Sequence, residues 1–336
     1  IRDSLNIDFE WLPETSPGFE LSGSGNLTND QQQRGTVTAE TDGRRVHIQL
    51  ANAPLDMVEP FLHHRTPDAR INGTVSGNMT FHAGETTQHA QNRLWTSVHL
   101  SVDVHKARVT SPEYFGSDEF YLEKVEIRGD LRVSEQQVAI DQLNLETDFA
   151  GIVAQGTWKT DELSKGGWTQ FFAQRDCSVN ATVDLAKLAQ LLPDTLHVRE
   201  GTYVEAGHIN IRFANSINNS IRTWYGEVET TNLVGRTATG RQLAWQQPLM
   251  VVFHAYDADD HVVIERFVCH SDFLVIEGKG QLESAEFSAR CDLNQLVKPL
   301  GQFVDLDRWQ LSGTAEAHRE RRCRQGEPCT VQGRAQ

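Results

Sequence analysis

The chain has 336 residues, of which 38% are hydrophobic and 23% charged, and its formal net charge is −15. The hydrophobic share is too high for a disordered chain, no run of about 18 apolar residues could span a membrane as a helix, and an acidic chain lacks the basic face that nucleic-acid phosphates require. This length fits two compact domains or one elongated domain. The hydrophobic share is nevertheless below the usual value of about 45–50%, which also counts glycine, so we expect a thin core or one open on a face.

Alternation of apolar and polar residues dominates the chain and predicts β-strands with one apolar face. In chain order the alternating stretches are 5–11, 46–50, 71–81, 98–104, 125–133, 207–213, 249–253 and 309–317. Strands with one polar, solvent-exposed face and one apolar face indicate an antiparallel sheet. Several predicted strands exceed the usual five or six residues, with bounds near 94–109 and 119–133. We therefore expect a long, curved and twisted sheet, in which glycines on the apolar parity permit bends or bulges.

Three short helices interrupt this pattern. Asp184 is a suitable N-cap for a helix at 184–192 that Pro193 ends, and Asp292 is suitable for one at 292–300. A weaker helical pattern occupies 55–62. Each helix is followed by an alternating strand that contains a glycine, namely Gly77, Gly207 or Gly313.

An internal repeat is visible when the chain is shifted by 264 − 140 = 124 residues. The shift places Ile140, Asp148, Phe149, Ile152 and Gly156 on Ile264, Asp272, Phe273, Ile276 and Gly280. Similar strands that converge on similar residues are the alternative explanation. Because the order of helix and strand is also kept, we favour duplication. It predicts a partial unit at 1–92 and two further units at 93–215 and 216–336, each of which buries its apolar face only by stacking on the next.

The cysteines and the chain ends carry limited information. Cys323 and Cys329 flank a turn-like segment, and a hairpin of that length could bring the two sulfurs within bonding distance; two unrelated thiols are the alternative. The chain begins at Ile1 without Met and stops in a strand-like stretch. We therefore expect it to be an internal piece of a longer protein.

Catalytic and metal-binding motifs are not apparent in the sequence. It contains no Gly-x-Ser-x-Gly elbow, His-Glu-x-x-His pair or phosphate-binding loop. His63 and His64 are adjacent and could not both face one ion, whereas His99 and His105 lie roughly 20 Å apart along an extended strand. We therefore predict no catalytic residue, metal or cofactor, and an enzyme is the weakest of three functional hypotheses.

Two stretches carry a resemblance to a known family. The helix Asp184–Pro193 leads into Leu196–Thr202 and then into the strand Gly207–Ile211, and the stretch Ser271–Leu282 combines a strand, Asp-Phe and Gly-x-Gly-x-Leu. Both resemble the AsmA-like periplasmic proteins, the group that includes TamB and the bridge-like lipid-transfer proteins. The resemblance covers nearly the whole chain through diffuse patterns of strand, glycine and short helix.

This resemblance implies both an architecture and a location. The fold would be a strongly curved antiparallel sheet, open along one side, whose concave apolar groove carries acyl chains between two membranes. The chain would lie in the periplasm or cell envelope, tethered to the inner membrane by a segment outside these 336 residues.

The leading hypothesis is thus a lipid-transfer segment of a cell-envelope protein that serves outer-membrane biogenesis or homeostasis. Its partner would be a phospholipid or another acyl lipid, and each buried CH₂ group would contribute about 0.8 kcal/mol. The predicted acyl-contacting residues are Val98, Leu100, Val102, Val125, Ile127, Leu131, Ile209, Ile211, Leu249, Val251 and Phe253. The alternative is a non-catalytic extracellular or periplasmic β-rich scaffold or interaction module without lipid.

Overall fold

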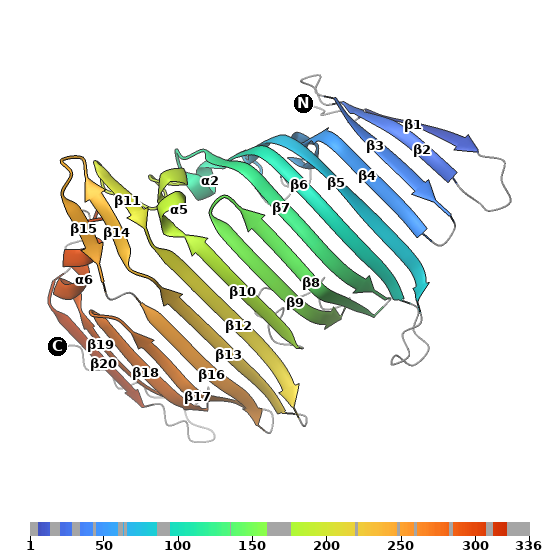
Figure 1. The fold of residues 1–336 in the computed structure, drawn as a ribbon. Helices are drawn as coiled ribbons and strands as arrows, with labels where there is room; N and C mark the ends of the chain where they lie inside the picture. Colours follow the sequence, from blue (N-terminus) through green and yellow to red (C-terminus); the bar gives the residue numbers. More distant parts are fainter. Residues whose placement is uncertain are drawn as a thin grey trace. The chain divides into compact units, whose positions relative to one another are not determined.

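The computed structural model describes residues 6–13, 21–28, 34–42, 45–59, 63, 66–85, 95–134, 136–159, 176–218, 221–246, 249–258, 261–281, 285–306 and 312–320. Within them the chain is mainly β, as the alternation predicts (Figure 1). The chain divides into two compact units, Ile1–Gln174 and Arg175–Gln336. Each unit makes most of its contacts within itself. The boundaries of the three repeat units expected from the sequence stay a prediction.

Unit 1 is an antiparallel meander in which each described strand pairs with its neighbours in the chain. Its strands are β1 (Asn6–Pro13), β2 (Leu21–Thr28), β3 (Arg34–Thr41), β4 (Arg45–Pro54), β5 (Arg70–Glu85), β6 (Trp95–Thr110), β7 (Phe120–Val133), β8 (Gln137–Thr147) and β9 (Ala150–Lys159). Two short helices lie between strands, the 3₁₀ helix η1 (Leu55–Val58) and α2 (Pro112–Phe115). The expected long strands are confirmed, since β6 has 16 residues and β7 has 14.

Unit 2 contains a second antiparallel meander and a small three-stranded sheet. The meander consists of β10 (Cys177–Asp184), β12 (His208–Asn218), β13 (Ile221–Thr230), β16 (Met250–Ala258), β17 (His261–His270), β18 (Leu274–Gln281), β19 (Glu286–Asp292) and β20 (Thr314–Glu320). The small sheet has the order β11 (Thr202–Ala206), β14 (Leu233–Thr237), β15 (Gln242–Trp245). Helix α5 (Leu185–Leu191) precedes β11, and α6 (Leu293–Leu300) precedes β20.

Two of the three predicted helices are confirmed with their caps. The Asp184 carboxylate accepts hydrogen bonds from the backbone N–H groups of Ala186 and Lys187 at 2.9 and 3.1 Å. Asp292 accepts equivalent bonds at the start of α6, at 3.0 and 3.2 Å. The third predicted helix is confirmed in part: the 3₁₀ helix η1 (Leu55–Val58) has no side-chain cap, because Pro54 occupies the cap position, and residues 60–62 lie outside the described part.

A glycine completes the first turn of each capped helix. The first helical N–H of α5, from Leu185, donates to the Gly207 carbonyl at 2.9 Å, and that of α6, from Leu293, donates to the Gly313 carbonyl at 2.9 Å. Both glycines have positive φ, 147° and 95°, a backbone conformation that favours glycine. After η1 the expected Gly77 lies on β5, and it is Gly73 on the same strand that has positive φ, 135°.

The ladders of the two units share their registers at the shift found in the sequence. Apart from the terminal pair Ala258–His261, every residue pair of β16–β17 and β17–β18 reappears in β7–β8 and β8–β9 when 124 is subtracted. Val251 opposite Cys269, for example, corresponds to Ile127 opposite Leu145. The bulges also coincide, since β8 gains an extra residue after Ile140 and β17 gains one after Ile264.

The packed core of unit 2 lies beneath the small sheet. Phe303 is 2% exposed and Leu243 3% exposed, and they form a cluster with Val204, Ala186 and Ala189. Helix α5, the small sheet and the segment that follows α6 thus form the compact apolar cluster identified in the described part of the chain.

Substitution of Gly77 by alanine should destabilise unit 1. A Cβ at this position would meet the carbonyl oxygen of Ser101 at 2.5 Å, so the backbone of β6 must move, which costs about 1–3 kcal/mol. Urea unfolding of Gly77→Ala would measure the loss. Gly151→Ala is the matched control, because no atom lies within 4 Å of a Cβ there, and an equal loss in both variants would contradict the prediction.

Removal of the α5 cap should also be measurable. Asp184→Ala leaves two N–H groups of the first turn without their acceptor, so the free energy of unfolding should fall by about 1 kcal/mol. Asp184→Asn keeps an oxygen in the same place and should restore most of that loss. Failure of the asparagine variant to restore stability would show that the cap is not responsible.

A candidate apolar binding face

Rows of apolar side chains cross unit 1 from strand to strand on one face of the sheet. Residues that are directly opposite in an antiparallel ladder point to the same side. One such row contains Leu50, Gly77, Val102, Ile127, Leu145 and Ile152. The next contains Ile48, Met79, Leu100, Gly129, Leu143 and Ala154, and a third contains Val46, Phe81, Val98, Leu131, Ile140 and Gly156. We call these rows the apolar face of unit 1.

Unit 2 has an equivalent face. One row consists of Ala181, Ile211, Val228, Val251, Cys269, Ile276 and Ala289, and the next of Val179, Phe213, Gly226, Phe253, Phe267, Gly278 and Phe287. These rows form the apolar face of unit 2. Predicted Ile209 lies two positions before Ile211 on β12, and predicted Leu249 directly precedes β16, where its carbonyl accepts the N–H of Thr230 at 3.0 Å.

Phenylalanine rings lie over glycines in the second row. A Cβ on Gly226 would meet the Phe253 ring at 1.9 Å, and one on Gly278 would meet the Phe287 ring at 2.4 Å. Each ring thereby reaches across the glycine, which places the Phe253 centroid 6.4 Å from that of Phe213. Aromatic cover of strand glycines helps to fix the register of a sheet, and in this row it brings the rings into two pairs, Phe213 with Phe253 and Phe267 with Phe287.

The apolar faces are only partly buried. Of the predicted acyl-contacting residues, Val98 is buried and the other ten are half-buried, and Val46 in the same rows is 38% exposed. Neighbouring strands cover the flanks of such side chains, whereas a second packed sheet would cover their tips. Within each unit the described meander strands form a single layer (Figure 1), so no second layer of described strands covers these tips.

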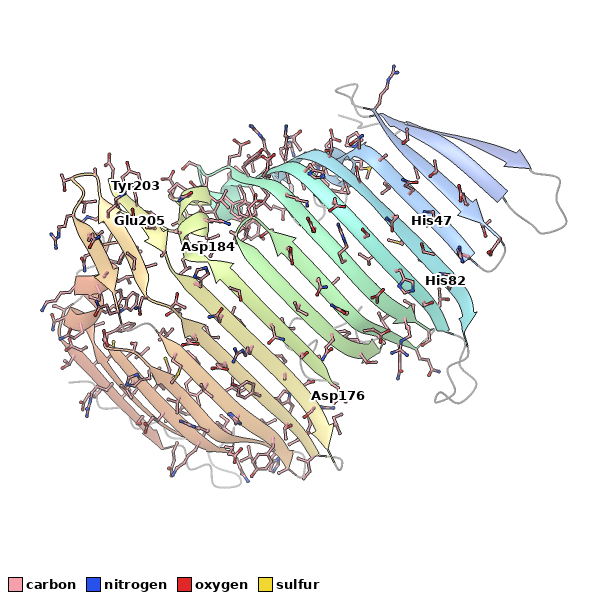
Figure 2. All side chains as sticks on the ribbon, in the orientation of Figure 1. His47, His82, Asp176, Asp184, Tyr203 and Glu205 are labelled. Carbon is pink, nitrogen blue, oxygen red and sulfur yellow. The ribbon has the colours of Figure 1, made fainter. Side chains whose placement is uncertain are left out.

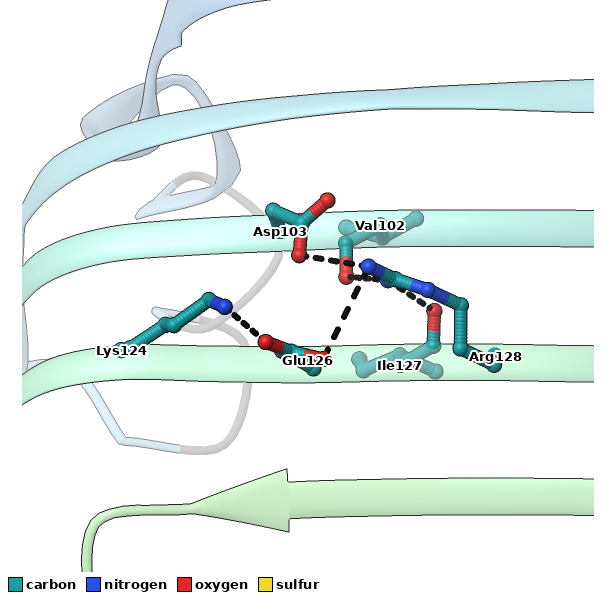
Figure 3. A network of polar contacts seen from close by, with 6 residues as sticks. All are labelled: Val102, Asp103, Lys124, Glu126, Ile127 and Arg128. Carbon is teal, nitrogen blue, oxygen red and sulfur yellow. Dashed lines mark hydrogen bonds and ion pairs between the residues drawn. The ribbon is translucent and has the colours of Figure 1, made fainter.

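Ion pairs occupy the opposite face. Asp103 and Glu126 are directly opposite each other on β6 and β7, and the Arg128 guanidinium lies between them, 2.8 Å from Asp103 and 3.8 Å from Glu126 (Figure 3). The same guanidinium donates to the Val102 carbonyl at 2.9 Å, and Lys124 pairs with Glu126. Arg128, which both carboxylates share, and Lys124, which pairs with Glu126 alone, thus offset two negative charges that would otherwise repel each other.

Sequence reasoning finds part of each face and misses the intervening strands. It identifies β6, β7, β12 and β16 but not β8, whose Leu143 and Leu145 are in the same rows, nor β13, which contributes Val228. Leu143 lies three residues from Ile140, and only the bulge between them brings both to one face. In β13, Gly226 and Thr230 interrupt the apolar alternation.

The remaining predicted features have no assembled site in the described part of the chain. No group of three or more His, Cys, Asp or Glu residues there could hold a metal ion. His47 on β4 and His82 on β5 lie on adjacent strands (Figure 2). His99 pairs with Asp130, and its Nδ1 lies 2.5 Å from the Oδ1 of that carboxylate. Burial raises the pKa of the Cys177 and Cys269 thiols, which favours the protonated form. Cys323 and Cys329 lie outside the described residues.

Comparisons with known proteins identify no family for this chain. No protein-family model, curated protein or solved structure matches the chain. None of the described helices has the length and hydropathy that a membrane-spanning helix needs.

Replacement of Arg128 should expose the repulsion between Asp103 and Glu126. Arg128→Met keeps an apolar stem but leaves the two carboxylates without their shared cation, so stability should fall by about 0.5–1 kcal/mol. The loss should shrink in about 1 M NaCl, because salt screens partly exposed charges. Urea unfolding at low and high salt measures both effects.

Arg290→Met is the matched control for this variant. Arg290 and its partner Glu316 are 75% and 64% exposed, so their pair should contribute little. An equal loss in both variants, or a loss that does not respond to salt, would contradict the role given to Arg128.

Proposed function

We propose that this chain is a non-catalytic, lipid-binding and lipid-transfer segment of a cell-envelope protein. The observation that carries the proposal is the pair of apolar faces, one in each unit, whose rows cross from strand to strand without a second layer of strands above them in the described part. A phospholipid or another acyl lipid is the proposed partner. Its transfer between membranes, a periplasmic location and a tether in the inner membrane follow from the AsmA-like resemblance.

The physical chemistry of the faces favours acyl chains over a polar partner. Half-buried Val, Ile, Leu and Phe side chains are stabilised when water is removed from their tips, by about 25 cal/mol for each Å² of apolar area. An acyl chain can supply this cover without hydrogen bonds. Large exposed apolar patches generally mark binding surfaces or aggregation-prone regions, and the strongly negative net charge of −15 opposes aggregation.

The recurring registers support a lipid-binding role for both units. The registers and bulges that recur at a shift of 124 place equivalent apolar rows in each unit. In the proposed function each unit presents such rows to acyl chains on a curved sheet that is open along one side. A unit whose apolar face is completed by its neighbour is typical of quasi-one-dimensional repeat proteins.

Site-specific photo-crosslinking tests the proposal. The photoreactive residue p-benzoylphenylalanine would replace Val102 or Val251, and the purified variants would be illuminated with vesicles that contain a radiolabelled phospholipid. We expect these positions to capture lipid several-fold more strongly than Ser101 and Val252. The latter precede or follow the test positions on the same strands and therefore point to the opposite face.

The control positions also distinguish the alternatives. All four residues are half-buried, so a difference in labelling cannot arise from exposure alone. Equal labelling of both faces, or no labelling of a folded protein, would reject the lipid proposal and leave the scaffold alternative.

A further inference from the structure

A separate cavity lies in unit 2, next to the small sheet. It has a volume of about 740 Å³ and is lined mainly by three segments, the first turn (199–202), the second turn (237–241) and the end of α6 (297–302). Its wall includes Leu243, which belongs to the packed core around Phe303. The cavity is therefore built on the most densely buried part of the described chain rather than on the single-layer sheet.

Hydrogen bonds hold the three segments together. The N–H of Arg199 donates to the Phe303 carbonyl at 2.8 Å, and its guanidinium donates to the Gly301 carbonyl at 2.7 Å. The N–H of Ala238 donates to the Gly201 carbonyl at 2.7 Å, which joins the second turn to the first. These bonds fix the relative positions of the backbones from which the lining side chains project.

Each segment contributes one cation to the cavity. Arg199 comes from the first turn, Arg241 from the second and Lys298 from α6, and Glu200 is the lone acidic residue of the lining. Their net charge of 3 − 1 = +2 contrasts with −15 for the whole chain. Among the described residues, neither Arg241 nor Lys298 has an ion-pair partner.

We propose that this cavity binds a phosphate group, carried either by a lipid headgroup or by a soluble compound. Arginine and lysine are the side chains that proteins use for phosphate oxygens, and the hydroxyls of Thr237 and Thr239, 2.8 Å apart, lie on the same wall. At physiological ionic strength charges more than about 8 Å apart are largely screened, so the cations of the lining act on a bound phosphate more strongly than distant carboxylates do.

The lining also limits the kind of phosphate compound. It contains no aromatic side chain, and bases of nucleotides and single-stranded nucleic acids are commonly held by stacking on such rings. A phosphate ester of a small polyol fits this lining better than a nucleotide. The proposal does not depend on acyl chains binding to the apolar faces.

Calorimetric titration and vesicle flotation with the full chain test this site. The soluble probes are inorganic phosphate and glycerol 3-phosphate, and the vesicles are phosphatidylcholine with or without phosphatidylglycerol. The double variant Arg241→Gln/Lys298→Gln should bind at least tenfold more weakly than the wild type. The control double variant Arg266→Gln/Lys279→Gln removes the same two charges from exposed positions on β17 and β18 and should bind normally.

A variant that should bind phosphate more tightly distinguishes loss of the binding site from misfolding. Glu200→Gln removes the one anion of the lining and should tighten binding several-fold, an effect that a damaged structure would not produce. Saturable binding of a soluble probe that follows this pattern assigns a soluble phosphate compound, whereas the pattern with phosphatidylglycerol vesicles alone assigns a headgroup. No saturable binding in either assay, or equal binding by the two double variants, would overturn the proposal.

Discussion

The register of the antiparallel ladders is the constraint on which the rest of this structure depends. Side chains alternate between the two faces of a strand. A shift of one residue in the pairing register would therefore move the apolar side chains of a strand to the polar, solvent-exposed face. The bulges maintain the correct parity where the sequence alone would lose it. Ile140 and Leu143 are three residues apart, yet the extra residue between them lets both face the same side, and Ile264 and Phe267 repeat this arrangement.

A correct register in a single layer produces a sheet with two chemically different surfaces. The apolar faces combine branched aliphatic side chains with rings that cover glycines, as Phe253 covers Gly226. The other face is held by ion pairs such as Arg128 with Asp103. Each surface stabilises the same ladders in a different way, since cross-strand apolar contacts act on one side and paired charges on the other. The proposed function then resides in the apolar side, over which the described strands place no second layer.

Local rules account for what can be predicted from the sequence. Alternation identifies β6, β7, β12 and β16 because each has several apolar residues in strict parity, and Asp184 and Asp292 identify two helices because N-capping needs only neighbouring residues. The pattern points to Gly77 whereas Gly73 has the positive φ, because both glycines share one parity and sequence does not reveal backbone conformation.

Features that depend on distant residues could not be predicted. Strand β13 owes its place in the sheet to its pairing with β12 and β16, since Gly226 weakens its own pattern. The small sheet and its cavity join Arg199, Arg241 and Lys298 through contacts between segments far apart in the chain. None of these cations stands in a motif, and most of the hydrogen bonds that hold their segments belong to the backbone, which almost any residue supplies.

Pairing between chain neighbours has a mechanical consequence for unit 1. Within the unit, each described strand is bonded only to the strand before and the strand after it. A tensile load applied across the two ends of such a meander loosens one hairpin at a time from an edge, rather than shearing many backbone bonds at once. We therefore expect β1 to separate first under load, while the inner ladders keep their apolar rows aligned.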